Sequence, residues 1–494
     1  MNRLNYKTLD DMGFNEYLLK DGKEKVLQFG EGNFLRAFVD YFIDLMNEKA
    51  SFDGKIVVVQ PIDQGLADMI NEQDGLFTLF LRGRENGKKV NNKRVISSIK
   101  RCINPYKDYD EYMKNAENAD LRFIVSNTTE AGITYDSSCK FDDKPASSFP
   151  AKVCQFLYKR YELGLKGFII LNCELIDHNG DELKRIVNLH IDDWGLGKDF
   201  KDWVNNENYF CSTLVDRIVT GYPRNEAEDI CKELGYEDKL LDTAETFGFW
   251  VIEGPQKIYD EFPVKEAGLD SNIIIVDDHM PYKQRKVRIL NGAHTSMVLG
   301  AYLAGQNIVR DCMNDEVIKG FMNKVIYDEV IPTLDLPKED LLDFAEKVTD
   351  RFNNPYVDHL LLSISLNSTS KWAARVMPTL LEYVKRFNKL PKAVTMSFAF
   401  YIKFYHNAAK VLNENSLTGK RGNDTYEVKD DKWVLEFYNN LKDVDNTKLA
   451  QEVISNEKMW GDKLKNLDGF YDEVVKDLDT IDKIGTYEAM KGIL

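Results

Sequence analysis

The first 280 residues alternate short β-prone runs with helix-like segments, and this alternation limits the possible folds more than any other feature of the chain. KVLQF (25–29) is a short apolar run, KIVVVQ (55–60) is a second one rich in valine, and residues 33–49 between them have helical periodicity. Strands that alternate with helices form βαβ units, in which the strands lie parallel and helices cover both faces of the sheet. We therefore predict a doubly wound, mostly parallel sheet over residues 1–280, with further strands at 76–82, 94–100, 121–127, 167–172, 246–254 and 272–278.

The chain changes character after about residue 281. Strand-like runs nearly disappear, and long amphipathic segments such as 289–305, 315–331 and 393–412 take their place. A chain of 494 residues is also longer than one hydrophobic core usually serves. We predict a mostly helical substrate and catalytic domain, all-α in class, over residues 281–494, with the polar segment 416–431 as a surface loop. A ligand is expected to bind in the cleft between two such domains.

A glycine turn follows the first strand, in the stretch LQFGEGNFLRAFVD (27–40). In a dinucleotide-binding fold the first glycine allows a tight turn, the second lets a pyrophosphate approach the backbone, and the next helix offers free N–H groups. Gly30 and Gly32 occupy these places, while Leu35 stands where a third glycine is usual. This context predicts a Rossmann-like domain, although strand–turn–helix junctions also use two glycines for geometry alone. With Asn127 at the end of a later strand, the candidate cofactor-binding residues are Phe29, Gly30, Glu31, Gly32, Asn33, Phe34, Arg36 and Asn127.

The residues after the second strand do not distinguish between two possible cofactors. Dinucleotide folds commonly read the adenosine ribose with an acidic residue at the end of that strand. Here the strand ends VVVQPID, so Gln60 stands in the expected place and Asp63 comes three residues later. Because Gln60 offers no carboxylate, NAD and NADP remain alternatives on this evidence.

A second motif, KVRILNGAHTSMVLG (286–300), opens the helical half directly after the last predicted strand. On an α-helix, Asn291 lies about 140° around from Lys286, and His294 lies about 60° from Asn291. Reduction of a ketone by hydride leaves an alkoxide that needs a proton. A partly buried lysine can supply it, and an asparagine can donate a hydrogen bond to the developing oxyanion. The alternative is a solvated Lys286 in the charged run KQRKVR and a His294 that belongs to the core.

The charge and the cysteines restrict the partners and the compartment. The chain has 65 basic and 81 acidic residues, a formal net charge of −16, which argues against nucleic acid and anionic membranes as partners. Its seven cysteines form no CxxC pair, which fits a reducing compartment. The N-terminus has no apolar signal region and no stretch is long enough to span a membrane. We expect a cytoplasmic protein.

The spacing Lys286, Asn291, His294 after a Rossmann-like domain resembles the polyol-specific long-chain dehydrogenase/reductase family, also called the mannitol dehydrogenase family. The resemblance covers nearly the whole chain and includes QDGLFTLFLRG, VSNTTEAGI, RFNNPYVDHLLLSISLNSTSKW and RVMPTLLEY. It implies that Lys286 is the general acid/base and that Asn291 and His294 assist it. It also implies NAD (NADH) as cofactor and a reaction that needs no zinc or other metal.

Within the family, FGEGNFLRAFVD and NCELIDHNG (172–180) resemble the members that interconvert D-tagaturonate and D-altronate in galacturonate breakdown. One departure concerns the oxyanion site, because mannitol dehydrogenases have a second asparagine in a CDN sequence. The matching residues here are Cys173, Glu174 and Leu175, which leaves Asn291 alone in that role. The alternatives are a fructuronate (mannonate) or mannitol/fructose dehydrogenase of the same family, or a non-catalytic nucleotide-binding sensor.

A hexuronate substrate has a carboxylate that mannitol lacks, and a basic pair offers a place for it. Lys371 and Arg375 lie at i and i+4 on one helical face, and an arginine can hold a carboxylate through two parallel hydrogen bonds. We predict Lys371 or Arg375 as the anchor, with His359 nearby. The alternative is a surface helix with two solvated cations or a buried ion pair. A monomer or small homo-oligomer is expected.

Overall fold

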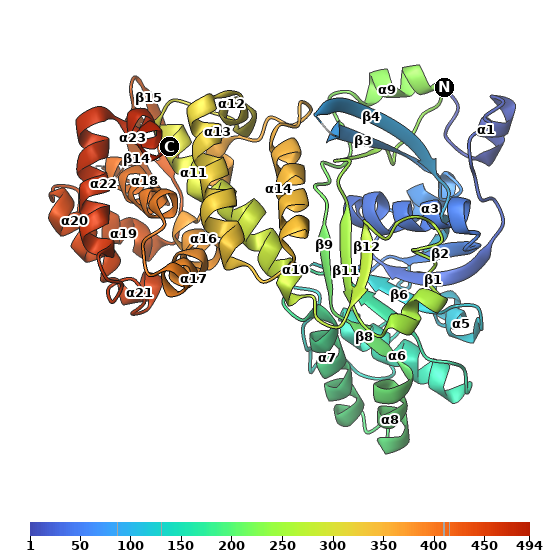
Figure 1. The fold of residues 1–494 in the computed structure, drawn as a ribbon. Coiled ribbons are helices and arrows are strands. Elements are labelled where there is room, and N and C mark those ends of the chain that lie inside the picture. Colours follow the sequence, from blue (N-terminus) through green and yellow to red (C-terminus); the bar gives the residue numbers. More distant parts are fainter. Residues whose placement is uncertain (86, 130, 409–410, 414) are drawn as a thin grey trace. The chain divides into compact units, whose positions relative to one another are not determined.

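A computed structural model describes residues 1–85, 87–129, 131–408, 411–413 and 415–494 (Figure 1). The chain divides into two compact units, and we describe each by itself. The N-terminal unit comprises Met1–Arg82 and Val90–His279, and the C-terminal unit comprises Gly83–Lys89 and Met280–Leu494. The division therefore falls one residue before the predicted boundary, and the short segment Gly83–Lys89, which the prediction left in the first domain, groups with the second unit.

A six-stranded sheet forms the centre of the N-terminal unit. Its strand order is β5-β2-β1-β6-β7-β8, and every neighbouring pair is parallel. This sheet and the helical second unit confirm the predicted fold class. In chain order the strands are β1 (Lys23–Phe29), β2 (Gly54–Val59), β5 (Ile99–Ile103), β6 (Phe123–Ser126), β7 (Ile169–Asn172) and β8 (Tyr209–Cys211).

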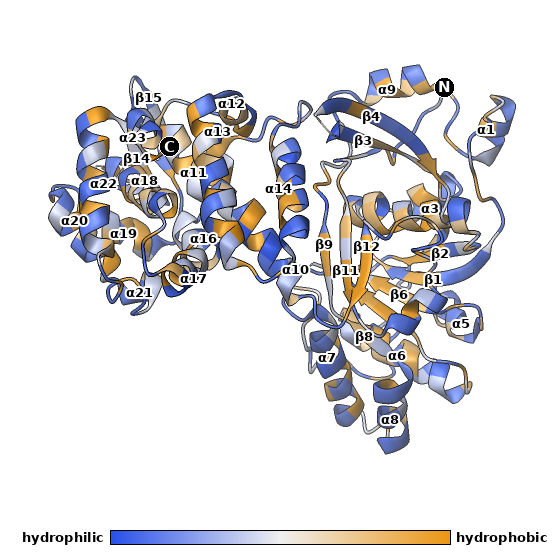
Figure 2. Ribbon diagram, viewed as in Figure 1, coloured by the Kyte–Doolittle hydropathy of each residue, from blue (hydrophilic) through white to orange (hydrophobic). Residues whose placement is uncertain are grey.

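Alternate residues of these strands enter two separate cores, one on each face of the sheet. In β2, Ile56 and Val58 pack into one core, while Val57 and Val59 pack into the other. This is the consequence of the two-residue period of a strand. Because both faces are covered, the buried parts of these strands are mostly apolar, as the orange strand segments of Figure 2 show. The first face carries α3 (Tyr41–Ala50), and the second carries α6 (Phe149–Glu162) and α7 (Asn179–Asp193).

Two smaller sheets contain the remaining predicted strands of the N-terminal half. One has the order β10-β3-β4 and the other the order β12-β11-β9. The runs at 76–82, 246–254 and 272–278 are therefore strands, but they do not extend the doubly wound sheet as predicted. Strand partners are chosen by tertiary packing, which an apolar run does not reveal. The bounds are β3 (Phe77–Glu85), β4 (Lys88–Ile96), β9 (Thr213–Asp216), β10 (Asp242–Ala244), β11 (Phe249–Glu253) and β12 (Ile273–Val276).

The C-terminal unit is built around helix α11 (Gly292–Leu303), which is buried along almost its whole length. It packs against α18 (Lys392–Ala408) and against α16 (Ser368–Arg375). A Cβ atom at Gly300 would lie 2.4 Å from the ring of Phe400, so glycine is what allows α11 and α18 to approach so closely. Continuous apolar packing on all sides explains why this segment lacks a polar face.

The segment 416–431 is not a plain loop, and this prediction was wrong. It forms an antiparallel hairpin of β14 (Leu417–Arg421) and β15 (Asp424–Val428), with β13 (Val411–Leu412) beside β14. Leu417, Tyr426 and Val428 turn inward and are buried, while the polar residues between them face outward. The alternation is that of a half-buried strand, hidden by the high content of polar residues.

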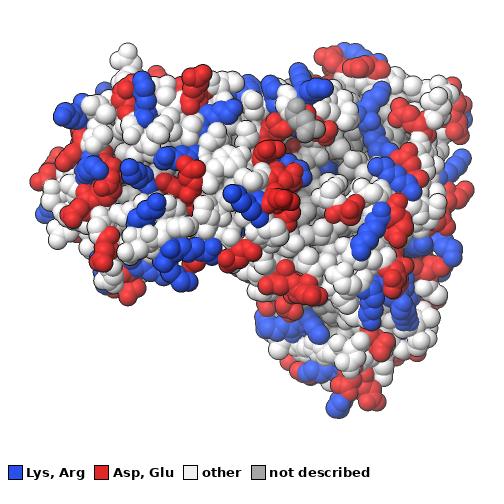
Figure 3. Space-filling model, in the orientation of Figure 1, with Lys and Arg blue, Asp and Glu red and all other residues white. Residues whose placement is uncertain are grey.

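No helix in the described ranges has the length and apolar character that crossing a membrane requires. Acidic and basic side chains are interspersed over the face shown in Figure 3.

Candidate active site

A cavity of about 580 Å³ lies in the N-terminal unit at the carboxyl end of the central sheet. This edge is where open α/β sheets bind their ligands. Four of the predicted cofactor residues line it, namely Gly30, Glu31, Gly32 and Asn127. The other described residues of its lining are Pro61, Ile62, Thr128, Thr129, Ala131, Gly132, Thr134, Asp136, Ser147, Ser148 and Phe149.

The glycine turn has the geometry that a dinucleotide needs. Gly30 has φ +122°, and a Cβ atom there would lie 3.2 Å from the carbonyl oxygen of Asn127. A Cβ atom at Gly32 would meet nothing within 4 Å, so the space in front of this backbone is open to a ligand. Gly32 also precedes a continuous helical run over residues 33–50, whose first turn has no side-chain cap. Open backbone N–H groups at a helix N-terminus suit a pyrophosphate, so the residues present fit this group.

Glu174 organises the loop on the other side of the cavity. Its carboxylate accepts hydrogen bonds from the N–H of Thr128 at 3.0 Å, from the hydroxyl of Thr128 and from the hydroxyl of Ser126. The side chain is 2% exposed, and burial raises the pKa of its carboxyl group. Glu174 therefore shapes the loop that presents Asn127 and Thr128. In the sequence this residue stood out only as a departure from the mannitol dehydrogenase pattern.

The other four predicted cofactor residues do not line the cavity. Phe29 is in the core, with its ring edge-on to Phe149, and Phe34 stacks on Phe38. Arg36 is 2% exposed, and its guanidinium donates to the carbonyl of Leu240 and to the side chain of Asn33. These residues hold the turn and its helix in place from behind.

In the C-terminal unit, Lys286 and Asn291 begin and end a π-helical turn, η4 (Lys286–Asn291). In such a turn each N–H bonds the carbonyl five residues earlier, so residues at i and i+5 are about one turn apart. An α-helix would separate them by about 140°. The π-turn therefore makes the angle between Lys286 and Asn291 smaller than the α-helical angle deduced from the sequence. The backbone carbonyl of Asn291 also accepts a hydrogen bond from the hydroxyl group of Thr295 at 2.8 Å.

His294 follows on α11 and is held as a neutral imidazole. Its ring stacks on Phe352 and lies edge-on to His359, with ring centroids 5.6 Å apart. Burial holds the pKa of His294 well below its usual value, and nearby cationic groups lower it further. Among the described residues, its Nε2 has no hydrogen-bond partner, although it is buried. A buried polar atom of this kind calls for a partner that a ligand can provide.

The titratable groups that act on His294 include all three predicted substrate-binding residues. His359, Lys371 and Arg375 each contribute to lowering the pKa of His294, and so does Arg351, which was not among the predicted site residues. Burial also lowers the pKa of Lys371 and of Arg375. Arg351 opens the stretch RFNNPYVDH, which was quoted for the family resemblance without a role. We call Arg351, Lys371 and Arg375 the cationic cluster; burial and the nearby Lys371 lower the pKa of His359, which therefore does not belong to it.

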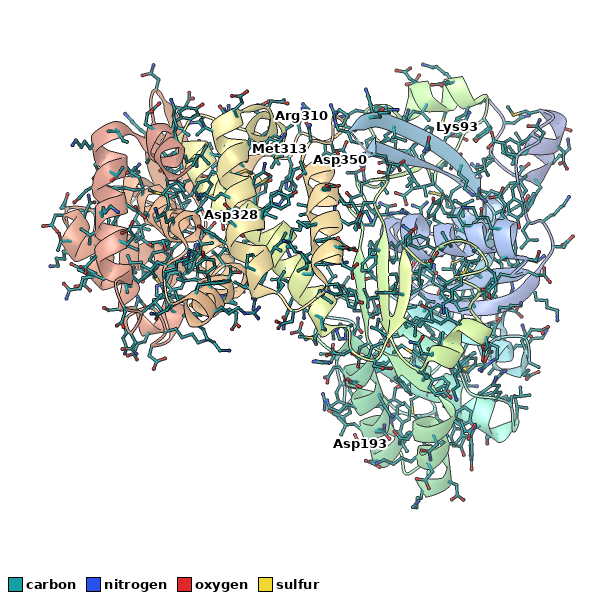
Figure 4. The ribbon with its side chains drawn as sticks, viewed as in Figure 1. Lys93, Asp193, Arg310, Met313, Asp328 and Asp350 are labelled. Carbon is teal, nitrogen blue, oxygen red and sulfur yellow. The ribbon has the colours of Figure 1, made fainter. Side chains whose placement is uncertain are left out.

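Backbone contacts hold the loop that carries His359. The N–H of Val309 donates to the carbonyl of His359 at 3.0 Å, and Arg310 donates to the carbonyl of Pro355 and pairs with Asp358. Figure 4 labels Arg310 on α12 (Val309–Asn314) and Asp350 on α14 (Lys338–Phe352), two helices that pack together. The loop that carries His359 is thus fastened to α12, while Arg351 lies on α14 and both Lys371 and Arg375 lie on α16.

One group of described residues offers ligands suited to a metal ion. The ligand atoms of Glu253, Asp278 and His279 all lie within 4.8 Å of one another, and Nδ1 of His279 is 2.6 Å from a carboxylate oxygen of Glu253. No metal was predicted from the sequence, in which Glu253 is 25 residues from Asp278, so that no local motif joins the three residues. As it stands, Glu253 and His279 form a hydrogen-bonded pair.

Both units of the chain match models of known protein domains. The model of the mannitol dehydrogenase Rossmann domain matches residues 24–265, and that of the mannitol dehydrogenase C-terminal domain matches residues 278–482. The chain is 45% identical over 479 residues to an altronate oxidoreductase of Enterobacter sp., covering 95% of this chain and 96% of that protein. It is 46% identical over 479 residues to an altronate oxidoreductase of Phocaeicola vulgatus, covering 95% and 97%.

Solved structures share the fold. A D-sorbitol dehydrogenase in substrate-free form has a TM-score of 0.82 at 21% identity, covering 99% of this chain and 100% of that one. A Pseudomonas fluorescens mannitol 2-dehydrogenase, in a ternary complex with NAD and D-mannitol, has a TM-score of 0.67 at 22% identity, covering 99% of each chain. The two family models together span most of the chain, so it belongs to the mannitol dehydrogenase family of oxidoreductases, as the resemblance predicted.

Proposed function

We propose that the chain is an NAD-dependent oxidoreductase that interconverts D-tagaturonate and D-altronate. The observation that carries the proposal is the cationic cluster around a neutral, buried His294, which suits a substrate with a carboxylate. The curated relatives at about 45% identity, which are altronate oxidoreductases, support the same substrate. The place of the reaction is hexuronate breakdown, starting from galacturonate.

The chemistry assigns separate tasks to the two units. NAD(H), when bound at the glycine turn, supplies or accepts the hydride. In the direction of reduction, the carbonyl oxygen of the substrate gains negative charge as hydride reaches its carbon. Asn291 donates a hydrogen bond to this oxygen, and Lys286 gives it a proton, acting as general acid. In the reverse direction Lys286 accepts the proton from the hydroxyl group.

The carboxylate of the substrate is held by the cationic cluster. Arg351 and Arg375 can each form two parallel hydrogen bonds with a carboxylate, and Lys371 adds a point charge. Lys371 already donates to the carbonyl of Ile364 at 2.8 Å, which orients its ammonium group. His294, neutral and unpartnered at Nε2 among the described residues, can hydrogen-bond a substrate hydroxyl without adding charge.

A side-by-side assay tests the proposal. Loss of NADH is followed with tagaturonate, fructuronate and fructose at equal concentrations, and the assay is repeated with NADPH. We expect tagaturonate to give the highest kcat/KM. Equal or better rates on fructose would contradict the uronate assignment. A preference for fructuronate would instead identify the chain as a fructuronate reductase of the same family. Binding of the cofactor without turnover of any ketose would instead favour the nucleotide sensor.

We also propose that the chain acts in the cytoplasm, as a monomer or small homo-oligomer, without nucleic acid or membrane partners and without zinc. The support is the net charge of −16 and a set of cysteines with no CxxC pair. Activity after dialysis against a chelator tests the independence from metal. Loss of activity that zinc restores would overturn that part and direct attention to Glu253, Asp278 and His279.

A further inference from the structure

Glu31, the residue between the two glycines, lies where the adenosine half of a dinucleotide is usually read. It lines the cavity together with Pro61 and Ile62, the residues that follow the end of β2. In Rossmann-like folds the carboxylate that bonds the adenosine ribose comes from the end of this second strand. Ile62 is 62% exposed, so it offers apolar surface at the same place. Glu31, which follows the first strand, therefore places a carboxylate where a residue at the end of the second strand usually provides one.

Gln60 is not available for this task, because its side chain is used inside the loop. Its amide nitrogen donates to the carbonyls of Ile62 and Asp63, both at 2.8 Å, and its amide oxygen accepts from the N–H of Ala67. Gln60 is 2% exposed. Its role is to shape the loop after β2, and both donor hydrogens and one of the two acceptor positions of its amide are used there.

Gly65 lets the Glu31 carboxylate reach this loop. A Cβ atom at Gly65 would lie 2.2 Å from a carboxylate oxygen of Glu31 and 2.6 Å from the amide carbon of Gln60. Both side chains thus lie against the bare backbone of Gly65, and any larger residue there would displace one of them. The position of Glu31 beside the end of β2 is therefore set by packing.

The carboxylate of Glu31 keeps room for further hydrogen bonds. Burial raises its pKa, against the lowering effect of the nearby backbone N–H groups of Glu31 and Leu66. A carboxylate has about four acceptor positions, so these two N–H groups leave positions for hydroxyl donors. Asp136, which also lines the cavity, accepts hydrogen bonds from Ser138 and Ser147.

Among the described residues, no cationic side chain lies beside Glu31 in the lining of the cavity. The described residues that line the cavity include no lysine or arginine. Arg36 acts on Glu31 electrostatically, but its guanidinium is buried and bonded to Leu240 and Asn33. A 2′-phosphate placed beside Glu31 would bring two like charges together without a basic partner.

We propose that Glu31 accepts the hydroxyl groups of the adenosine ribose and thereby selects NAD(H) over NADP(H). This inference rests on the dinucleotide use contained in the proposed function. The carboxylate that determines cofactor specificity would then come from the glycine turn and not from an acidic residue after β2.

Direct binding tests it in the full-length protein. Affinities for NADH and NADPH are measured by isothermal titration with the parent, with Glu31→Gln and with Asp63→Asn. Asp63→Asn is the matched control, because it removes the same charge from the exposed residue nearest the rival position after β2. We expect Glu31→Gln to weaken NADH binding about 10-fold to 100-fold, as for one or two hydrogen bonds to a charged acceptor. The preference for NADH over NADPH should fall, while Asp63→Asn leaves it unchanged.

A third ligand separates the hydrogen bond from general effects. The affinity for 2′-deoxy-NAD⁺ should fall less than the affinity for NAD⁺ when Glu31 becomes Gln. An unchanged NADH/NADPH ratio in Glu31→Gln, or an equal shift in Asp63→Asn, would overturn the inference. A parent protein that binds neither nucleotide would overturn the proposed function itself. Near-parent thermal stability of Glu31→Gln excludes misfolding as the cause of any loss.

Discussion

The rings of His294 and Phe352 lie face to face, with centroids 3.8 Å apart and planes inclined by only 9°. The phenyl ring covers one side of the imidazole, which leaves His294 8% exposed although cationic groups lie close to it. A charged imidazole would lose hydration here and would meet like charges. The stacking thus keeps His294 neutral in a place where a substrate anion is expected.

The neutral state of His294 predicts a pH dependence of stability. In the unfolded chain the imidazole has a pKa near 6.5, whereas in the folded protein its pKa is well below that value. Below about pH 6.5 the unfolded chain therefore binds a proton that the folded protein does not, and stability falls as pH decreases, by at most about 1.4 kcal/mol per pH unit. Thermal unfolding between pH 5 and 8 measures this. His294→Asn should show a shallower fall, and an identical slope in parent and variant would contradict the assignment.

Lys286→Met should abolish proton transfer while preserving cofactor binding. We expect kcat to fall about 100-fold to 10,000-fold, the range typical of a general acid/base, with unchanged affinity for NADH. Lys385→Met is the control, since Lys385 is an exposed lysine of the same unit that pairs with Glu382. Steady-state kinetics and NADH titration give the two quantities. Turnover close to that of the control would remove Lys286 from the mechanism.

Arg351→Gln should weaken the binding of hexuronates specifically. Because hydrogen bonds to a charged partner are lost, we expect KM for tagaturonate to rise about 10-fold to 100-fold. Any slow reduction of fructose, which has no carboxylate, should be unaffected. Arg386→Gln serves as control, because Arg386 forms ion pairs with Asp335 and Glu382 away from His294. A parallel loss on fructose would show that Arg351 supports the structure rather than the carboxylate.

Asp40 predicts a pH effect of opposite sign in the N-terminal unit. Burial raises the pKa of this carboxyl group from 3.8 to about 8. Between these values the unfolded chain has lost the proton that the folded protein retains, so this group's contribution to stability decreases as pH rises from about 4 to 8. Asp40→Asn, which stays neutral, should remove that decrease. Urea unfolding at pH 6 and pH 8.5 compares the two proteins, and an equal pH response would contradict the raised pKa.

Local pattern was sufficient for the parts of the protein that depend on neighbours in the chain. The alternation of β-prone runs with helical periodicity predicted the parallel sheet, because burial on both faces of a sheet requires apolar strands. The glycine turn predicted a ligand-binding edge, and four residues around Gly30 and Asn127 do line a cavity. The spacing of Lys286, Asn291 and His294, joined to the family resemblance, indicated the family. Each of these features depends on residues that lie close together in the sequence.

The tertiary structure decided which side chains meet and what each can do. Arg36 looked like part of the cofactor site, but the fold places it behind the turn, bonded to Leu240. Arg351 joined the cationic cluster only because α14 packs within the C-terminal unit. Glu31 reaches the end of β2 because Gly65 leaves space for it. The sequence by itself determined secondary structure and family, because these follow from local periodicity and motif. The tertiary structure determined which residues form the site, because the burial and charge of a side chain depend on neighbours that are distant in the sequence.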